Sequence, residues 1–163
     1  MGTSDFIGGR GESIAKNRLT WTHPDNVESF FWPHFLGEKA GVFDFLVVLR
    51  EPGVSGCFFF AQVKTTRRDL SGTRKPRRLQ VRLTELEVRR MAAFPAPTYL
   101  VGVQEPSERA FIVGIDGRMS RGVSSITTAH ELNDETLLRL WSEVHGFWRS
   151  FDPDKKTSTF RND

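Results

Sequence analysis

The amino-acid sequence predicts a single domain of the α/β (α+β) fold class, for three reasons. Amphipathic segments that start with helix-capping residues alternate with short runs of β-branched and aromatic residues. The expected elements follow the order α-β-β-β-α-β-β-α, which is typical of a mixed sheet with helices packed against it. At 163 residues, with 38% hydrophobic residues, the chain can bury one core. We expect this domain to span residues 1–151 and a polar tail to span 152–163.

The first half of the chain predicts a helix and a β-hairpin. GGRGESIAKNRLTW, residues 8–21, indicates a helix with a glycine-rich start. Residues 22–40 contain prolines and glycine, which favours an irregular segment with at most a short helix or strand. The apolar runs at 43–50 and 57–66 indicate two strands joined by the turn EPGVSG, residues 51–56.

The second half predicts a strand, a helix, two further strands and a final helix. These are expected at 79–83, 84–94, 97–103, 109–115 and from Asn133 or Asp134 onward, with 117–130 as a loop. Thr84 and Glu87 form the T-x-x-E pattern of a capping box at the start of the first of these helices.

Positive charge is concentrated in one segment. Residues 64–82 hold eight lysines and arginines against one acid, Asp69, a net charge of +7 in a chain whose total is +3, so the remainder sums to −4. Such a run is either a solvated loop or a surface for a phosphate backbone, and its position in the fold decides between them. The expected nucleic-acid contacts are Arg67, Arg68, Arg74, Lys75, Arg77 and Arg78.

Three polar residues stand out at the end of the expected hairpin. If its turn centres near Gly53, Asp44 lies opposite Gln62, and Gln62 and Lys64 share a face because they are two residues apart. A carboxylate, an amide oxygen and an ammonium group then converge at one end of the hairpin. A structural salt bridge between Asp44 and Lys64 explains two of these residues, but not the glutamine.

This pattern resembles the motif of the PD-(D/E)XK nuclease superfamily. Asp44 is followed after 17 intervening residues by Gln62-Val63-Lys64, and FDFLVV…AQVKTT is similar to an uncharacterised prokaryotic branch with a D…QVK motif. The resemblance extends over about residues 8–115. It implies a restriction-endonuclease-like αβββαβ core and a Mg²⁺-dependent (or Mn²⁺-dependent) endonuclease. The implied substrate is DNA, with RNA as the other possibility, in prokaryotic defence or DNA processing.

The resemblance also implies a role for each residue of the motif. Asp44, Gln62, the backbone carbonyl of Val63 and an acid on the first helix, Glu12, would bind the metal through hard oxygen ligands. Lys64 would orient or deprotonate the attacking water and stabilise charge on the phosphate. Gln62 stands where the family usually has an acid, which weakens metal binding. The alternative is therefore a catalytically degenerate module that binds nucleic acid or a partner protein.

Several other function classes are disfavoured by composition. No apolar run approaches the roughly 18 residues of a membrane span, and the N-terminus lacks the pattern of a secretory signal. The single cysteine, Cys57, excludes an internal disulfide and a cysteine zinc cluster, and its apolar neighbours predict a buried thiol. GGRG at 8–11 lacks the Lys-Ser/Thr ending of a P-loop and indicates a flexible helix start. We expect a cytoplasmic protein without a membrane partner; a homodimer and a complex with a partner protein are both open at this point.

Overall fold

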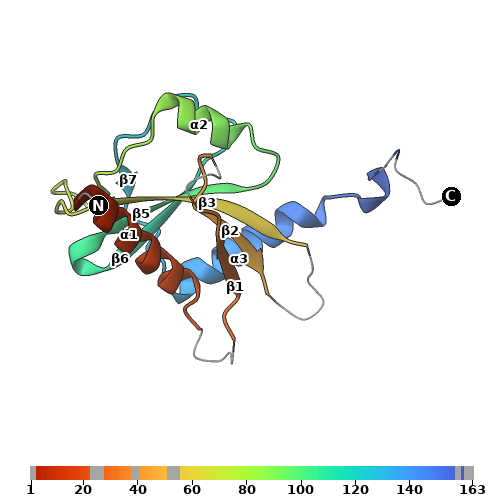
Figure 1. The fold of residues 1–163 in the computed structure, drawn as a ribbon, viewed down its shortest axis with the longest axis horizontal. Coiled ribbons are helices and arrows are strands. Elements are labelled where there is room, and N and C mark those ends of the chain that lie inside the picture. Colours follow the sequence, from red (N-terminus) through yellow and green to blue (C-terminus); the bar gives the residue numbers. More distant parts are fainter. Residues whose placement is uncertain (1–2, 23–27, 38–40, 51–55, 157–158, 160–163) are drawn as a thin grey trace.

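A five-stranded mixed sheet forms the centre of the protein (Figure 1). The computed structural model describes residues 3–22, 28–37, 41–50, 56–156 and 159. The strand order is β1-β2-β3-β5-β6, and the β3–β5 pair is parallel while the other neighbours are antiparallel. The strands are β1 (Phe31–Phe35), β2 (Phe45–Leu49), β3 (Phe58–Thr66), β5 (Thr98–Gln104) and β6 (Arg109–Gly114).

Helices cover both faces of this sheet. α1 (Thr3–Leu19) and α3 (Asp134–Arg149) lie on one face, and α2 (Glu85–Ala92) lies on the other (Figure 1). A second, two-stranded sheet pairs β4 (Arg78–Leu79) with β7 (Ile126–Thr127), and the short 3-10 helices are η1 (Glu105–Ser107) and η2 (Pro153–Lys155). The predicted mixture of helices and strands is confirmed.

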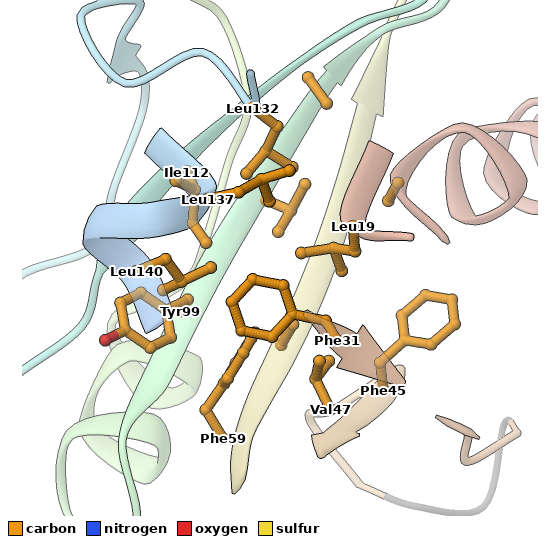
Figure 2. Close-up of a cluster of buried hydrophobic side chains, with 14 of the residues drawn as sticks. Leu19, Phe31, Phe45, Val47, Phe59, Tyr99, Ile112, Leu132, Leu137 and Leu140 are labelled. Carbon is orange, nitrogen blue, oxygen red and sulfur yellow. The ribbon is translucent and has the colours of Figure 1, made fainter. Parts of the chain in front are cut away.

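Two hydrophobic clusters hold the layers together, one on each face of the sheet. Phe59 of β3 packs beneath α1 and α3, in the cluster that contains Leu19 and Leu137 (Figure 2). The second cluster lies under α2 and includes the fully buried Val88 and Leu100. Because successive strand residues point to opposite faces, β3 contributes to both layers and is the axis of the fold.

The hairpin register agrees with the sequence prediction. Phe45 of β2 pairs with Ala61 of β3, so the next position places Asp44 opposite Gln62. β2 begins at Phe45, whereas β3 continues to Thr66. The last residues of β3 therefore extend beyond β2 and pair only with β5 on the other side. α2 lies in the crossover between β3 and the parallel β5.

The glycine-rich segment lies inside the first helix, so its interpretation as a flexible helix start is wrong. α1 begins at Thr3 and ends at Leu19, earlier at both ends than the predicted 8–21. Gly11 is buried where α1 crosses β3, and a Cβ atom there would lie 1.7 Å from Thr65 Oγ1. The close approach of the helix to the strand therefore requires glycine at this position.

The prediction of a strand at 79–83 is also wrong beyond its first residue. β4 covers only Arg78–Leu79, because β5 already pairs with β3 along the side that a new strand would need. The alternating apolar residues of 79–83 are instead buried in the cluster under α2. Three strands of the central sheet precede α2, and the one that was not predicted is β1, which lies in the segment 22–40 that was expected to be mostly irregular.

The remaining predictions concern the helix ends and the segments between elements. Thr84 and Glu87 form the predicted capping box, and Asn133 caps α3. β7 occupies part of the predicted loop 117–130, and Cys57 is buried as expected. No helix in the described part of the chain is long and apolar enough to cross a membrane. Residues 23–27 and 38–40, the predicted turn at 51–55, and 157–158 and 160–163 of the predicted tail lie outside the described residues.

Candidate functional site

Asp44 lies directly before β2, and its carboxylate accepts a backbone hydrogen bond from the neighbouring strand, β3. Its backbone N–H donates to the Ala61 carbonyl at 3.0 Å, and its Oδ2 accepts the backbone N–H of Val63 at 2.6 Å. In an antiparallel pair the N–H and C=O of one residue point the same way, so the Val63 carbonyl faces this side as well. The Asp44 carboxylate and the Val63 carbonyl therefore lie together at the end of the paired region.

The surroundings of Asp44 disfavour the ionised form of its carboxyl group. Burial raises the pKa of this carboxyl group, the Val63 hydrogen bond and the Lys64 charge lower it, and the nearby Glu87 raises it again. The net direction is upward. A carboxyl group whose ionised form is disfavoured by burial is typical of functional sites, because a bound cation or substrate offsets the cost.

Gln62 carries a buried acceptor oxygen that has no donor among the described residues. The residue is only 8% exposed, and no group in the described part of the chain donates a hydrogen bond to its Oε1. An unsatisfied buried acceptor costs about 1–3 kcal/mol. Gln62 shares a sheet face with Asp44 and Lys64, so this oxygen lies on the side of β3 that carries both charged groups.

Lys64 pairs with an acid that the sequence analysis did not place in the site. Its Nζ lies 2.9 Å from Glu87 Oε1, and the two side chains are 30% and 24% exposed. The considered Asp44–Lys64 salt bridge is therefore replaced by a pair between β3 and α2. The sequence analysis assigned Glu87 only to the capping box. The signal that could have placed it in the site was its position in the first turn of the helix that follows the QVK strand.

Glu87 is ionised in this arrangement. Its Oε2 accepts hydrogen bonds from the backbone N–H and the hydroxyl of Thr84, at 2.7 and 2.9 Å. Burial opposes the charge, but these bonds and Lys64 outweigh it and lower the pKa of the Glu87 carboxyl. The same carboxylate thus caps α2 and holds the Lys64 ammonium over the sheet.

Glu12 belongs to α1, which packs on the sheet face opposite to that of Lys64. It is partly buried on α1, the helix whose Gly11 packs against Thr65 on the opposite face of β3 from Lys64. Among the described residues, no group of three or more His, Cys, Asp or Glu side chains is arranged to hold a metal ion. The structure brings together Asp44, Gln62 and Val63 of the predicted set.

The basic segment begins at the same end of β3 as these residues. Arg67 follows Lys64 by three residues, about 10 Å along a strand, and the loop is closed by a bridge between Ser71 and Arg78. Arg67 pairs with Glu105 at 3.2 Å, and Arg78 donates to the Ser125 carbonyl at 2.7 Å. In Figure 1 the loop extends from β3 beside the N-terminal end of α1.

The other basic side chains of this loop project into solvent. They form no ion pair within the described residues, and all are exposed: Arg68, Arg74, Lys75 and Arg77. The loop therefore presents exposed positive charge next to the end of β3 that carries Lys64, which is the position expected of a phosphate-binding surface.

Comparisons of this chain with protein-family models, with curated proteins and with solved structures gave no match. The functional assignment therefore depends on the geometry of Asp44, Gln62, Lys64 and Glu87 and on the adjoining basic loop.

Proposed function

We propose that the protein is a metal-dependent nuclease of the PD-(D/E)XK type that hydrolyses DNA phosphodiester bonds. The observation that carries this proposal is the unused, buried Oε1 of Gln62 beside the carboxylate of Asp44, on the sheet face that also bears Lys64. The order α1-β1-β2-β3-α2-β5, with β3 and β5 parallel, supports a restriction-endonuclease-like core. The adjoining basic loop supports nucleic acid as the substrate.

The residues present fit a hard divalent cation such as Mg²⁺ or Mn²⁺. The Asp44 carboxylate, the Gln62 amide oxygen and the Val63 carbonyl are all oxygen donors, the type that these ions prefer. When bound, the cation would polarise the scissile phosphate and lower the pKa of a water ligand. A positive charge here would also offset the burial that raises the pKa of Asp44. We assign no ligand role to Glu12, since α1 packs on the other face.

The chain's own residues would position and stabilise the reacting phosphate. Glu87 holds the Lys64 ammonium at 2.9 Å, which fixes a positive charge on the face where the phosphate would lie. This charge stabilises the negative charge that develops on the phosphate oxygens as the P–O bond breaks. The exposed Arg68, Arg74 and Arg77 would bind the backbone beyond the scissile bond by charge alone.

A binding module without activity is the second candidate. Gln62 supplies a neutral amide where a carboxylate would bind a cation more strongly, and no three-acid group forms among the described residues. Such a module would bind nucleic acid in a salt-sensitive manner through the basic loop and leave it intact.

A cleavage assay separates the two candidates. Purified protein is incubated with end-labelled DNA and RNA in Mg²⁺, Mn²⁺ or EDTA. We expect metal-dependent cleavage that is abolished by Asp44→Ala and by Lys64→Ala, and retained by Glu12→Gln. Asp116→Ala serves as the matched control, because this aspartate pairs with Arg118 on the surface.

Two outcomes would count against the nuclease assignment. Cleavage that survives both Asp44→Ala and Lys64→Ala shows that the site lies elsewhere. Salt-sensitive binding without hydrolysis in either metal favours the binding module. Mn²⁺ titration gives an independent measure, since Gln62→Glu should tighten ion binding if the ion lies between this residue and Asp44.

A further inference from the structure

An open apolar cavity of about 620 Å³ lies beside the candidate site. Its lining includes three aromatic rings, two aliphatic side chains and one charged group: Phe43, Phe60, Phe94, Leu36, Val42 and Arg90. Apolar pockets with a few polar groups are the usual form of small-molecule binding sites. The second hydrophobic cluster under α2 forms its floor through the buried Phe43.

The cavity and the candidate site are adjacent because they take neighbouring residues from the same three segments. These pairs are Phe43 with Asp44, Phe60 with Gln62 on β3, and Arg90 with Glu87 on α2. Two residues on one strand face are about 6.6 Å apart. Residues three apart on a helix lie on the same side. A ligand that contacts Phe60 in the cavity therefore lies about 6.6 Å along β3 from Gln62 and about 13 Å from Lys64.

The three rings form an aromatic wall. The ring centroids of Phe43 and Phe60 are 4.9 Å apart, and Phe94 packs edge-on against both, at 5.1 and 4.9 Å. Phe94 is 41% exposed at the rim, so this part of the wall is open to solvent. Nucleobases stack on such rings because each base has a flat π-face.

Arg90 adds the polar recognition that a base requires. It is the charged residue of the cavity lining and is exposed on the side of α2 that bears Glu87. Its guanidinium offers five N–H donors, which match the acceptor atoms on a base edge or the oxygens of the attached phosphate. An aliphatic ligand, in contrast, has no acceptor atom for these donors.

We propose that this cavity receives the unpaired base of the nucleotide whose phosphate lies at Asp44, Gln62 and Lys64. The substrate class is then a nucleic-acid strand with unpaired bases, such as a single strand or a flap. This inference rests on the proposed function of the same site. A base within a duplex would first have to be unpaired and unstacked before it could enter.

Binding measurements in EDTA test the cavity independently of cleavage. A labelled single-stranded 12-mer is compared by fluorescence anisotropy with a 12-mer of the same charge in which every nucleotide is abasic. The wild-type protein should bind the intact strand about tenfold more tightly, the effect of one stacked base. Phe94→Ala and Arg90→Gln should each reduce this ratio. Phe151→Ala, which removes a ring that is 50% exposed and lies two residues beyond α3, should leave it unchanged.

The abasic strand also reports on folding, because a folded Phe94→Ala variant should bind it as the wild type does. Equal binding of both strands by the wild type would overturn the inference. So would a Phe94→Ala variant with an unchanged ratio; a cavity that docks a protein segment would give that result.

Cleavage rates then distinguish failure of this inference from failure of the nuclease proposal. We expect faster cutting of single strands than of duplex, and loss of this preference in Phe94→Ala. Cutting without any dependence on unpaired bases overturns the cavity assignment while the nuclease stands. Base-dependent binding without cutting in either metal supports the cavity and overturns the nuclease.

Discussion

Glu87→Gln is the most informative test of how the site is held together. The wild-type carboxylate uses one oxygen for Thr84, at 2.7 and 2.9 Å, and the other for Lys64, at 2.9 Å. Glutamine has one acceptor oxygen. It can therefore satisfy either Thr84 or Lys64, and turns its NH₂ group toward the other donor.

The expected loss follows from these contacts. A hydrogen bond between charged groups contributes about 1.5–3 kcal/mol and a neutral one about 0.5–1.5 kcal/mol. Both side chains of the Lys64–Glu87 pair are less than one-third exposed, so solvent screens the interaction only in part. We expect Glu87→Gln to lower the free energy of unfolding by about 1–2 kcal/mol at pH 7. Glu87→Ala also removes the hydrogen bonds that the Glu87 side chain accepts from Thr84 in the capping box, and it should cost about 1 kcal/mol more.

The direction of the pKa shift of Glu87 determines how its contribution to stability changes with pH. Hydrogen bonds from Thr84 and Lys64 overcome the effect of burial and lower the pKa of Glu87 in the folded protein. The stabilisation is therefore fully present above the unfolded pKa, near 4.5, and is lost as the pH falls through the lower folded value. The difference between wild type and Glu87→Gln should shrink as the pH is lowered from 7 to 3.

Urea denaturation monitored by circular dichroism measures both effects. Glu85→Gln is the matched control, because Glu85 lies on the same helix and pairs with Arg89 on the surface. That exposed pair should contribute less than about 0.5 kcal/mol. The reasoning is refuted if Glu87→Gln costs no more than Glu85→Gln, or if its cost stays constant down to pH 3.

Three further predictions concern the surroundings of the site. Asp44→Asn keeps an acceptor for the Val63 N–H and removes a carboxyl group whose pKa is raised by burial, so it should increase the free energy of unfolding at pH 7. The gain should disappear as the pH falls and Asp44 of the wild type becomes protonated. A variant that is less stable than the wild type at pH 7 would contradict this. Gly11→Ala should destabilise by about 1–3 kcal/mol, and a double-mutant cycle with Thr65→Gly should recover most of it, because the clash involves the whole Thr65 side chain. Replacing Arg74 and Arg77 together by glutamine should reduce the slope of log K against log salt for duplex DNA by about 2, as measured by anisotropy; an unchanged slope would exclude them from the interface.

Local patterns in the sequence predicted the register of the hairpin and the starts of α2 and α3. A turn centred near Gly53 was sufficient to place Asp44 opposite Gln62, because the register of a hairpin follows from the position and length of its turn. The capping box at Thr84 and the start of α3 depend on bonds within one helical turn. Such interactions lie within a few residues of each other and are therefore readable without the fold.

The tertiary structure decided which distant segments meet. The strand predicted at 79–83 depended on a vacant side of β3 that β5 occupies, and β1 lies in a segment whose own pattern was weak. The contact of Gly11 with Thr65 and the aromatic cavity beside Asp44 likewise join separate elements.

Residue types and spacing in the sequence alone determined the register of Asp44 and Gln62, the shared face of Gln62 and Lys64, and the nearness of positive charge to them. The pairing of Lys64 with Glu87, and the burial that leaves the Gln62 oxygen unused, came only from the packing of α2 over β3. Side-chain partners and burial depend on which elements stack in three dimensions, and short-range patterns carry little information about that.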